Sequence, residues 1–276
     1  MPPNRTMMSA EAARIISRPR ISASRIILPT EHGSWAFLFE PLIAGSLIAY
    51  SPAAPWIALI AIGAFFARQP LKTYYIVRKR TDASASAIRY TAIFATISLI
   101  GAAAGISLAG ISILYPLLIS ALLAALQFYL DISSKGRSLL AEIAGAAAIS
   151  ASAAMLIAAG GLGWPFAIAV WTVFTARFVP SILYVRNRLQ LEKGKPFDHT
   201  MPIAAHLAGL VAVFLLAIIG LASFLTAAMF VFLLVRAIVG LSEYRSRIKA
   251  MRIGVWEVVY GVLTLVSIVI GYYAGI

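Results

Sequence analysis

The chain has 276 residues, of which 61% are hydrophobic and only 12% are charged, and its mean hydropathy is +0.91. Soluble domains carry about 25% charged residues, so this composition excludes an ordinary soluble domain and favours an integral membrane protein. The chain has no cysteine, which excludes disulfides, thiolate metal sites and iron–sulfur clusters. A net charge of +13 can attract nucleic acid, but the way this charge is distributed argues against a nucleic-acid partner.

Residues 1–27 form a basic arm that is rich in serine and alanine. Its five arginines leave no apolar core before a cleavage site, so we expect no signal peptide here and predict that the first span acts as the insertion signal. Two interpretations of the arm stay open, an interfacial helix and a disordered segment that sets the topology. The rest of the chain, 28–276, is predicted to form a single transmembrane domain.

Apolar runs near 20 residues long recur along the chain, and each matches a hydrocarbon core of about 30 Å. The pattern predicts an all-α integral membrane protein, a polytopic bundle of about nine transmembrane helices. A continuation of the second predicted span through 68–80 is also open. The predicted spans are 34–50, 54–67, 87–108, 112–130, 139–159, 164–184, 202–222, 224–241 and 253–274.

Positive charge alternates from one predicted link to the next. The short links after the first, third, fifth and seventh spans carry no Lys or Arg. All 23 Lys and Arg lie in the arm, in the other links, or in the span ends beside those links. Because cytoplasmic links retain Lys and Arg, we predict a multi-pass protein of the cell membrane with its N-terminus in the cytoplasm and, with nine spans, its C-terminus outside.

A polar stretch opens the first predicted span. Glu31 and His32 lie at its mouth, and Glu40 lies inside it. A carboxylate at membrane depth costs about 3 kcal/mol or more, so it usually faces a protein interior or a wet cavity. Glu31 and Glu40 would lie about 13 Å apart along a helix, which suggests a polar cavity that opens on one side of the bundle.

Other ionisable side chains also lie inside predicted spans, on different helices. The simplest arrangement is a shared pocket that faces the cytoplasm. Helical spacing supports it, because Arg177 and Tyr184 share one face, as do Glu257 and Tyr260. Arginine together with tyrosine can hold a phosphate, a carboxylate or a carbonyl. The six residues are Glu40, Glu142, Arg177, His206, Arg236 and Glu257.

These patterns define two sets of candidate site residues. The predicted catalytic residues are Glu40, Glu257, Glu31 and His32. The predicted substrate-binding residues are Arg68, Lys72, Tyr75, Arg177, Tyr184, Arg186, Arg236 and Tyr260.

Structural interpretations of the same residues stay open. Arg177 and Arg236 could pair with Glu40 or Glu257 as structural salt bridges, since a buried charge needs a partner whatever its role. His32 and His206 could ligate haem or a metal, but neutral packing histidines are far more common. The chain has no phosphate loop, nucleophile elbow or paired His/Glu motif, so we predict no metal site.

The block Glu31-His-Gly-Ser-Trp-Ala-Phe37, together with Glu40-Pro41 and Arg68-Gln-Pro-Leu-Lys72, resembles the bacterial YwiC-like membrane proteins. The likeness runs over most of the chain. It implies a membrane protein and no particular reaction.

A second resemblance is more distant. Nine spans, a cytoplasmic N-terminus and polar links after the second and sixth spans look like the UbiA-type intramembrane prenyltransferases. In that family, aspartate-rich motifs in these links hold magnesium and a prenyl diphosphate. Here the first link has only Asp82 and the second has Glu192 and Asp198, so the motifs do not support magnesium and we expect no cofactor. The resemblance implies the fold and the pocket position. In place of the missing aspartate motifs, Arg68, Lys72, Arg177 and Arg186 could bind an anion directly.

The leading hypothesis is a UbiA-like membrane protein that binds or transfers an isoprenoid or a lipid-linked anionic substrate. The Arg/Lys group would stabilise a phosphate leaving group, while Glu40 or Glu257 would orient the acceptor or take its proton. The first alternative is a transporter of a small anion or metabolite with these carboxylates as proton carriers, and possible kinks at Pro41 and Pro180 keep it open. The second is a non-catalytic scaffold or assembly factor in the lipid bilayer.

Overall fold

The computed structural model describes residues 34–77, 81–133 and 138–275, and in these ranges it is helical with no strand. Each predicted span corresponds mainly to one helix, although the spans 34–50 and 202–222 run past the ends of their helices and the span 112–130 begins in a short 3-10 helix. The continuation of the second span is confirmed as far as Val77, and the sixth extends to Glu192. The helices are α3 (Ser34–Ile48), α4 (Ala54–Val77), α5 (Thr81–Ala109), the short 3-10 helix η1 (Gly110–Ile113), α6 (Leu114–Ser133), α7 (Leu139–Ala159), α8 (Trp164–Glu192), α9 (Thr200–Ile218), α10 (Phe224–Leu241) and α11 (Ala250–Ala274).

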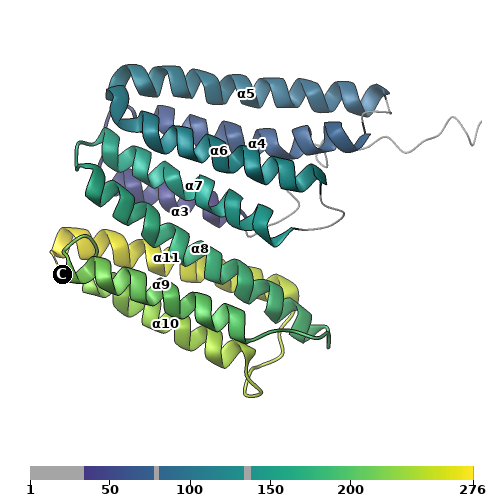
Figure 1. The fold of residues 1–276 in the computed structure, drawn as a ribbon, viewed down its shortest axis with the longest axis vertical. Helices are drawn as coiled ribbons and strands as arrows, with labels where there is room; N and C mark the ends of the chain where they lie inside the picture. Colours follow the sequence, from purple (N-terminus) through teal and green to yellow (C-terminus); the bar gives the residue numbers. More distant parts are fainter. Residues whose placement is uncertain (1–33, 78–80, 134–137, 276) are drawn as a thin grey trace, which may run out of the picture.

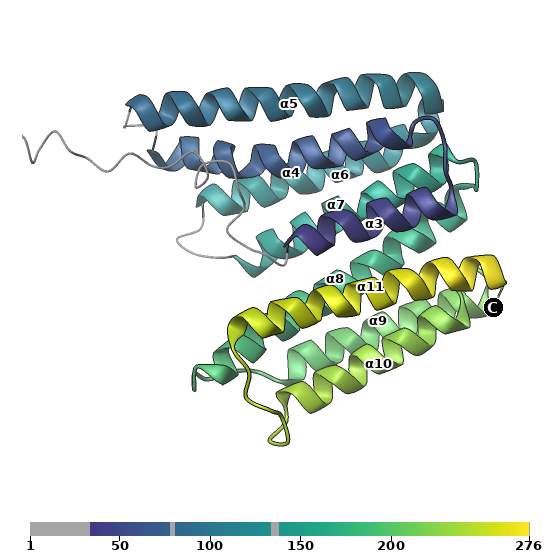
Figure 2. The same cartoon turned by 180° about the vertical axis from the view of Figure 1, so that it is seen from behind.

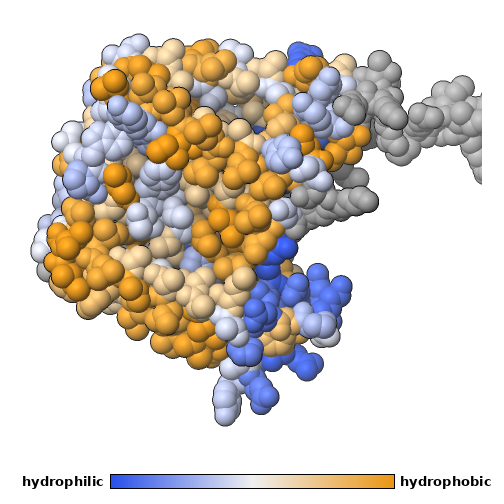
Figure 3. All heavy atoms as spheres, viewed as in Figure 1, coloured by the Kyte–Doolittle hydropathy of each residue, from blue (hydrophilic) through white to orange (hydrophobic). Residues whose placement is uncertain are grey.

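Seven stretches of the described chain are long and apolar enough to cross a membrane. One of them, Ser84–Ser133, has 50 residues and covers both α5 and α6, and the shorter apolar helix Trp35–Ile48 adds to the seven. Apolar side chains cover most of the face in Figure 3, and the most hydrophilic residues gather at one end of the helices. The lengths and the apolar composition of these helices confirm the prediction of a polytopic membrane protein.

The helices run side by side and the links alternate between two ends of the molecule (Figures 1 and 2). We call one the uncharged end, because its links 49–53, 110–113, 160–163 and 219–223 contain no Asp, Glu, Lys or Arg. The last residues of α11 lie there too. We call the other the basic end. Its links carry the Lys and Arg residues that the sequence groups together.

Tight turns at the uncharged end depend on glycine. Gly110 has φ +67° and Gly220 has φ +74°, in the left-handed region that glycine enters at little cost. In the same link as Gly220, the Ser223 hydroxyl accepts a hydrogen bond from the Thr226 N–H at 2.9 Å and caps α10. These local devices keep the links short.

Helix α3 lies between two groups of helices, α4–α7 and α8–α11, and contacts α7 and α11. Its Leu38 and Leu42 belong to one apolar core with residues of α4, η1 and α7. Its Ala44 and Ile48 belong to the other, with residues of α7 to α11. Phe37 of α3 stacks on Phe178 of α8, with ring centroids 4.4 Å apart. Helix α3 therefore places Glu40 among helices from the second group.

Small residues allow the helices to approach closely, as expected in a bilayer. A Cβ atom at Gly101 on α5 would lie 2.7 Å from the carbonyl oxygen of Trp56 on α4. One at Gly63 on α4 would lie 2.7 Å from the carbonyl oxygen of Phe94 on α5. The small-residue run of α7 is buried in the centre of the molecule. These small residues therefore form contact faces between helices.

Candidate functional site

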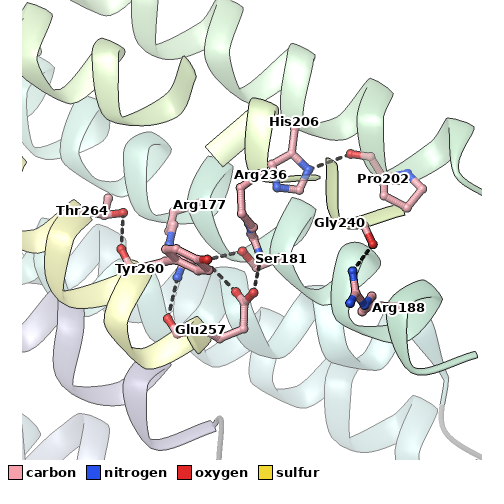
Figure 4. Close-up of polar contacts among 10 residues, drawn as sticks. All are labelled: Arg177, Ser181, Arg188, Pro202, His206, Arg236, Gly240, Glu257, Tyr260 and Thr264. Carbon is pink, nitrogen blue, oxygen red and sulfur yellow. Dashed lines mark hydrogen bonds and ion pairs between the residues drawn. The ribbon is translucent and has the colours of Figure 1, made fainter. Parts of the chain in front are cut away.

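A polar cluster lies inside the group α8–α11, against α3. We call it the intramembrane cluster. Figure 4 shows Arg177 of α8, Arg236 of α10 and Glu257 of α11 pointing toward one another. Its members are Glu40, Arg177, Ser181, Tyr184, His206, Arg236, Glu257 and Tyr260.

Arg177 is the largest of the fully buried side chains, with 0% of its side chain exposed. One guanidinium nitrogen, Nη2, donates to the backbone carbonyl of Glu257 at 3.0 Å. The other, Nη1, donates to the hydroxyl of Ser181 one turn along α8 and lies 3.6 Å from Oε2 of Glu257. A guanidinium buried in this way needs the carboxylate, because an unpaired buried charge is strongly destabilising.

Arg236 lies between two tyrosine rings. Its Cζ atom lies 4.0 Å from the ring centroid of Tyr184 and 4.8 Å from that of Tyr260, and both distances are in the range of cation–π contacts. Its Nη1 donates to Oε1 of Glu257. Nε and Nη2 of Arg236 are buried and make no hydrogen bond to the described residues. Arg236 thus keeps two donors for a further acceptor.

Glu40 is 4% exposed, and neither of its carboxylate oxygens accepts a hydrogen bond from the described residues. Its carboxylate packs against Gly261 of α11, where a Cβ atom would collide with it. The charged groups that act on it electrostatically are Arg177 and Glu257. Glu40 is therefore a second carboxylate near Arg177, and it has no hydrogen-bonding partner among the described residues.

His206 is buried on α9. Its Nδ1 hydrogen-bonds the carbonyl of Pro202, one turn earlier in the same helix, at 2.8 Å. Its Nε2 is buried and has no partner among the described residues. The ring meets the edge of Tyr184 with a centroid separation of 6.4 Å. The backbone hydrogen bond accounts for Nδ1 of this histidine and leaves Nε2 buried without a partner among the described residues.

The structure tests the shared arrangement of six buried ionisable residues. It brings five of them together, and Glu142 is the exception. Glu142 on α7 instead accepts from Nη1 of Arg186 at 2.9 Å, and this pair is partly exposed. The ion pairs that the structural interpretation expects are present for Glu257, which pairs with both Arg177 and Arg236.

Arg68 and Lys72 lie elsewhere, on α4. Both pair with Asp131 of α6, at 2.8 and 3.3 Å, and the Asp131 side chain is only 6% exposed. Tyr75 lies one turn further on the same helix, is exposed, and contacts the ring of Phe128. The cations that the sequence assigns to one site therefore have three different carboxylate partners, Asp131, Glu142 and Glu257.

Sequence reasoning missed two features. Asp131 was not proposed as a partner for Arg68 and Lys72, although its place at the end of a span next to a basic link was a usable signal. Arg188 is buried and donates to the carbonyls of Gly240 and Ser246, the second at 2.6 Å, besides pairing with Glu192 at 2.9 Å. This arginine ties α8 to the α10–α11 link.

Glu31 and His32, and the arm 1–27, lie outside the described residues. Within the described ranges, no group of three or more His, Cys, Asp or Glu side chains is placed to hold a metal ion.

Residues 28–157 match the family model of the YwiC-like proteins. The match covers α3 to α7, just under half of the chain, and so a smaller share than the resemblance implied. Of the intramembrane cluster, only Glu40 lies inside the matched range. No curated protein and no solved structure matches the chain.

Proposed function

We propose that this chain, a YwiC-like membrane protein by its residues 28–157, is a transporter that carries a small organic anion together with a proton across the membrane. The observation that carries the proposal is Glu40. It is a buried carboxylate with no hydrogen-bonding partner among the described residues, in the electrostatic environment of Arg177 and of Glu257, which itself pairs with both Arg177 and Arg236.

The charges of the cluster couple the binding of the proton to the binding of the anion. With both carboxylates ionised, the two glutamates balance Arg177 and Arg236, and the cluster needs no further anion. With a proton on Glu40, one positive charge is in excess, and burying it without a partner is costly. A bound anion would balance that charge. Proton binding at Glu40 and anion binding at the arginines therefore favour each other, and such coupling is reciprocal.

The two guanidinium nitrogens of Arg236 that lack a partner among the described residues provide a binding site for the anion. Nε and Nη2 make no hydrogen bond to the described residues, while the two tyrosine rings hold the guanidinium in position. A carboxylate, phosphate or sulfonate oxygen is the acceptor that a guanidinium prefers. No metal or organic cofactor is part of this proposal.

The topology belongs to the proposal as well. We propose nine spans with the N-terminus and the basic end in the cytoplasm, because Lys and Arg gather at that end. The intramembrane cluster then lies nearer the cytoplasmic side, since Glu257 is seven residues into α11 and about 10 Å from its start.

The transferase hypothesis stays as the second candidate, supported by the same free donors on Arg236. Its diphosphate site, however, used Arg68, Lys72, Arg177 and Arg186 together. These side chains pair with carboxylates on different helices, so they would have to leave those partners to meet one substrate. Transport needs no such rearrangement of α4 and α7.

The test is proton-linked flux in liposomes that contain the purified protein and a trapped pH-sensitive dye. A panel of permanently charged sulfonates, with phosphate added, avoids the passive entry of weak acids. Addition of a transported anion should acidify the interior. Glu40→Gln should reduce that signal to the level of empty liposomes, whereas Glu142→Gln should leave it unchanged, because Glu142 lies in a separate pair with Arg186.

Two results would overturn the proposal. One is an unchanged ratio of protons to anions in Glu40→Gln, which would remove the proton carrier. The other is a prenylated product, formed by the same purified protein from an added isoprenoid diphosphate without any anion flux, which would favour the transferase.

A further inference from the structure

A cavity of about 570 Å³ lies at the uncharged end, inside the same group of helices as the intramembrane cluster. Its size is in the range of small-molecule sites. Most of its lining is apolar, and three aromatic rings contribute to it. Among its lining residues are Phe166 and Val173 of α8, Ala217 of α9, Phe224 of α10, and Ile268 and Tyr272 of α11.

The same four helices, α8 to α11, line the cavity near the uncharged end and carry the intramembrane cluster further along their axes. On α8, Val173 lines the cavity and Arg177 follows one turn later. On α9, Ala217 lines the cavity, and His206 lies eleven residues away, or about 16 Å. On α10, the cavity residue Thr226 lies ten residues before Arg236. On α11, the cavity residue Ile268 lies eleven residues after Glu257. Cavity and cluster therefore follow one another along the interior of a single four-helix group.

Buried apolar side chains lie between the two levels. Phe174, Val213 and Phe230 are 0%, 0% and 3% exposed and belong to one apolar core with the cavity residues Val173 and Ile268. Phe230 reaches across to α9, where a Cβ atom at Gly209 would lie 3.6 Å from its ring. We call these three residues the apolar plug. The plug separates the cavity from the arginines.

From this order we infer that the cavity is the outer entrance for an organic anion with an apolar body, and that the apolar plug is the gate between that entrance and Arg177 and Arg236. The inference rests on the proposed transport function and names its substrate class. The apolar lining suits a hydrocarbon or aromatic body, and the cations one level further in suit its charged group. A small inorganic ion would gain little from such a lining, because burying apolar surface supplies the binding free energy here.

The chain offers a clean test because it contains no cysteine. Ala222→Cys places a thiol on the lining of the cavity, and Ile219→Cys places one in the same link but outside the lining, on a residue that is 65% exposed. A membrane-impermeant thiol reagent, added to the face that carries the C-terminus, should label both variants in liposomes.

Two sulfonates then serve as probes, benzenesulfonate with an apolar ring and methanesulfonate without one. Benzenesulfonate should slow the labelling of Ala222→Cys along a saturation curve, about tenfold at ten times its Kd, because only empty cavities react. It should not change the labelling of Ile219→Cys, and methanesulfonate should protect neither variant.

The plug is tested by Ser181→Cys, whose thiol lies beside Arg177. The thiol reagent added to this face should not label Ser181→Cys when Phe230 is present. It should label the double variant with Phe230→Ala, because that change removes the ring between the cavity and the cluster. Labelling of Ser181→Cys with Phe230 intact would contradict the gate.

The outcomes separate the two proposals. Labelling of Ala222→Cys that neither sulfonate slows, alongside proton-linked flux of sulfonates, would overturn the entrance and leave transport standing. Protection by benzenesulfonate without any flux would retain the cavity as a binding site and overturn transport. Ala222→Cys that reacts in detergent but never in liposomes would indicate that a lipid chain fills the cavity, and would also overturn the inference.

Discussion

At the scale of single residues, Glu40 is defined by what surrounds it. Its carboxylate lies against the backbone of Gly261 and shares the electrostatic environment of Arg177 and Glu257. Replacing Gly261 with alanine therefore acts on the Glu40 carboxylate without changing the charge of the cluster. The alanine variant changes the position of the Glu40 carboxylate, whereas Glu40→Gln removes its ability to ionise. Comparing the two variants separates these effects.

We predict that Gly261→Ala impairs proton-linked flux and lowers the free energy of unfolding by about 1–3 kcal/mol, because its methyl group would overlap the Glu40 carboxylate. The measurement is anion-dependent acidification of liposomes, together with the thermal unfolding midpoint in detergent. Gly254→Ala is the matched control, since it lies on the same helix and a Cβ atom there meets nothing within 4 Å. Equal flux in the two variants would mean that the close contact at Gly261 has no functional weight.

At the scale of elements, two helix contacts depend on buried ions outside the cluster. Helices α4 and α6 meet through Asp131, and α8 meets the α10–α11 link through Arg188. Arg68 and Lys72 are each about one-third exposed, whereas the Arg188 side chain is only 4% exposed. The exposure of the cations decides how much each contact contributes, because an exposed ion regains water when its partner is removed.

For the α4–α6 contact we predict that Asp131→Asn costs only about 1 kcal/mol and leaves proton-linked flux intact. Glu243→Gln, on an exposed residue of the α10–α11 link, is the control. A complete loss of flux in Asp131→Asn at unchanged stability would indicate that Arg68 and Lys72 act with the cluster after all, as the transferase hypothesis requires.

For the α8 contact we predict that Arg188→Ala costs about 3 kcal/mol, because it leaves Glu192 and two carbonyls with fewer partners in a buried place. The readouts are thermal unfolding in detergent and the rate of proteolysis within the α10–α11 link. Lys195→Ala, on an exposed lysine close in sequence, should change neither. A proteolysis rate equal to that of the unchanged protein would show that Arg188 does not hold the link.

At the scale of the whole molecule, charge is distributed unequally between the two ends of the helices. The charged links lie at one end of the helices, while the uncharged links and the last residues of α11 lie at the other (Figures 1 and 3). A bilayer would place these ends in different compartments, since short links rich in Lys and Arg stay in the cytoplasm.

We predict that a reporter fused after Ile276 is active outside the cytoplasm, and that the same reporter fused within the α10–α11 link, after Arg247, is active inside. Alkaline phosphatase and a fluorescent protein give opposite signals in the two compartments and check each other. A cytoplasmic signal from both fusions would refute an odd number of spans, and with it the outer position of the cavity.

A polytopic helical membrane protein, the order of its long helices in the described ranges, and the grouping of their links at two ends were all predictable from the sequence. These follow from the lengths of apolar runs and from the placement of Lys and Arg, both of which are local properties that a bilayer selects directly. The sequence also identified most residues of the intramembrane cluster, because an ionisable group inside an apolar run needs a protein environment wherever it lies.

The ionisable side chains that contact one another became known only from the packing of the helices. The sequence assigned Arg68, Arg177 and Arg186 to one site, and the structure divides them among Asp131, Glu257 and Glu142. It also placed the glycine beside Glu40, and the cavity and the plug above Arg177. Neither result could be read from spacing, since helical periodicity fixes the face of a residue along its own helix but not the neighbour that this face will meet.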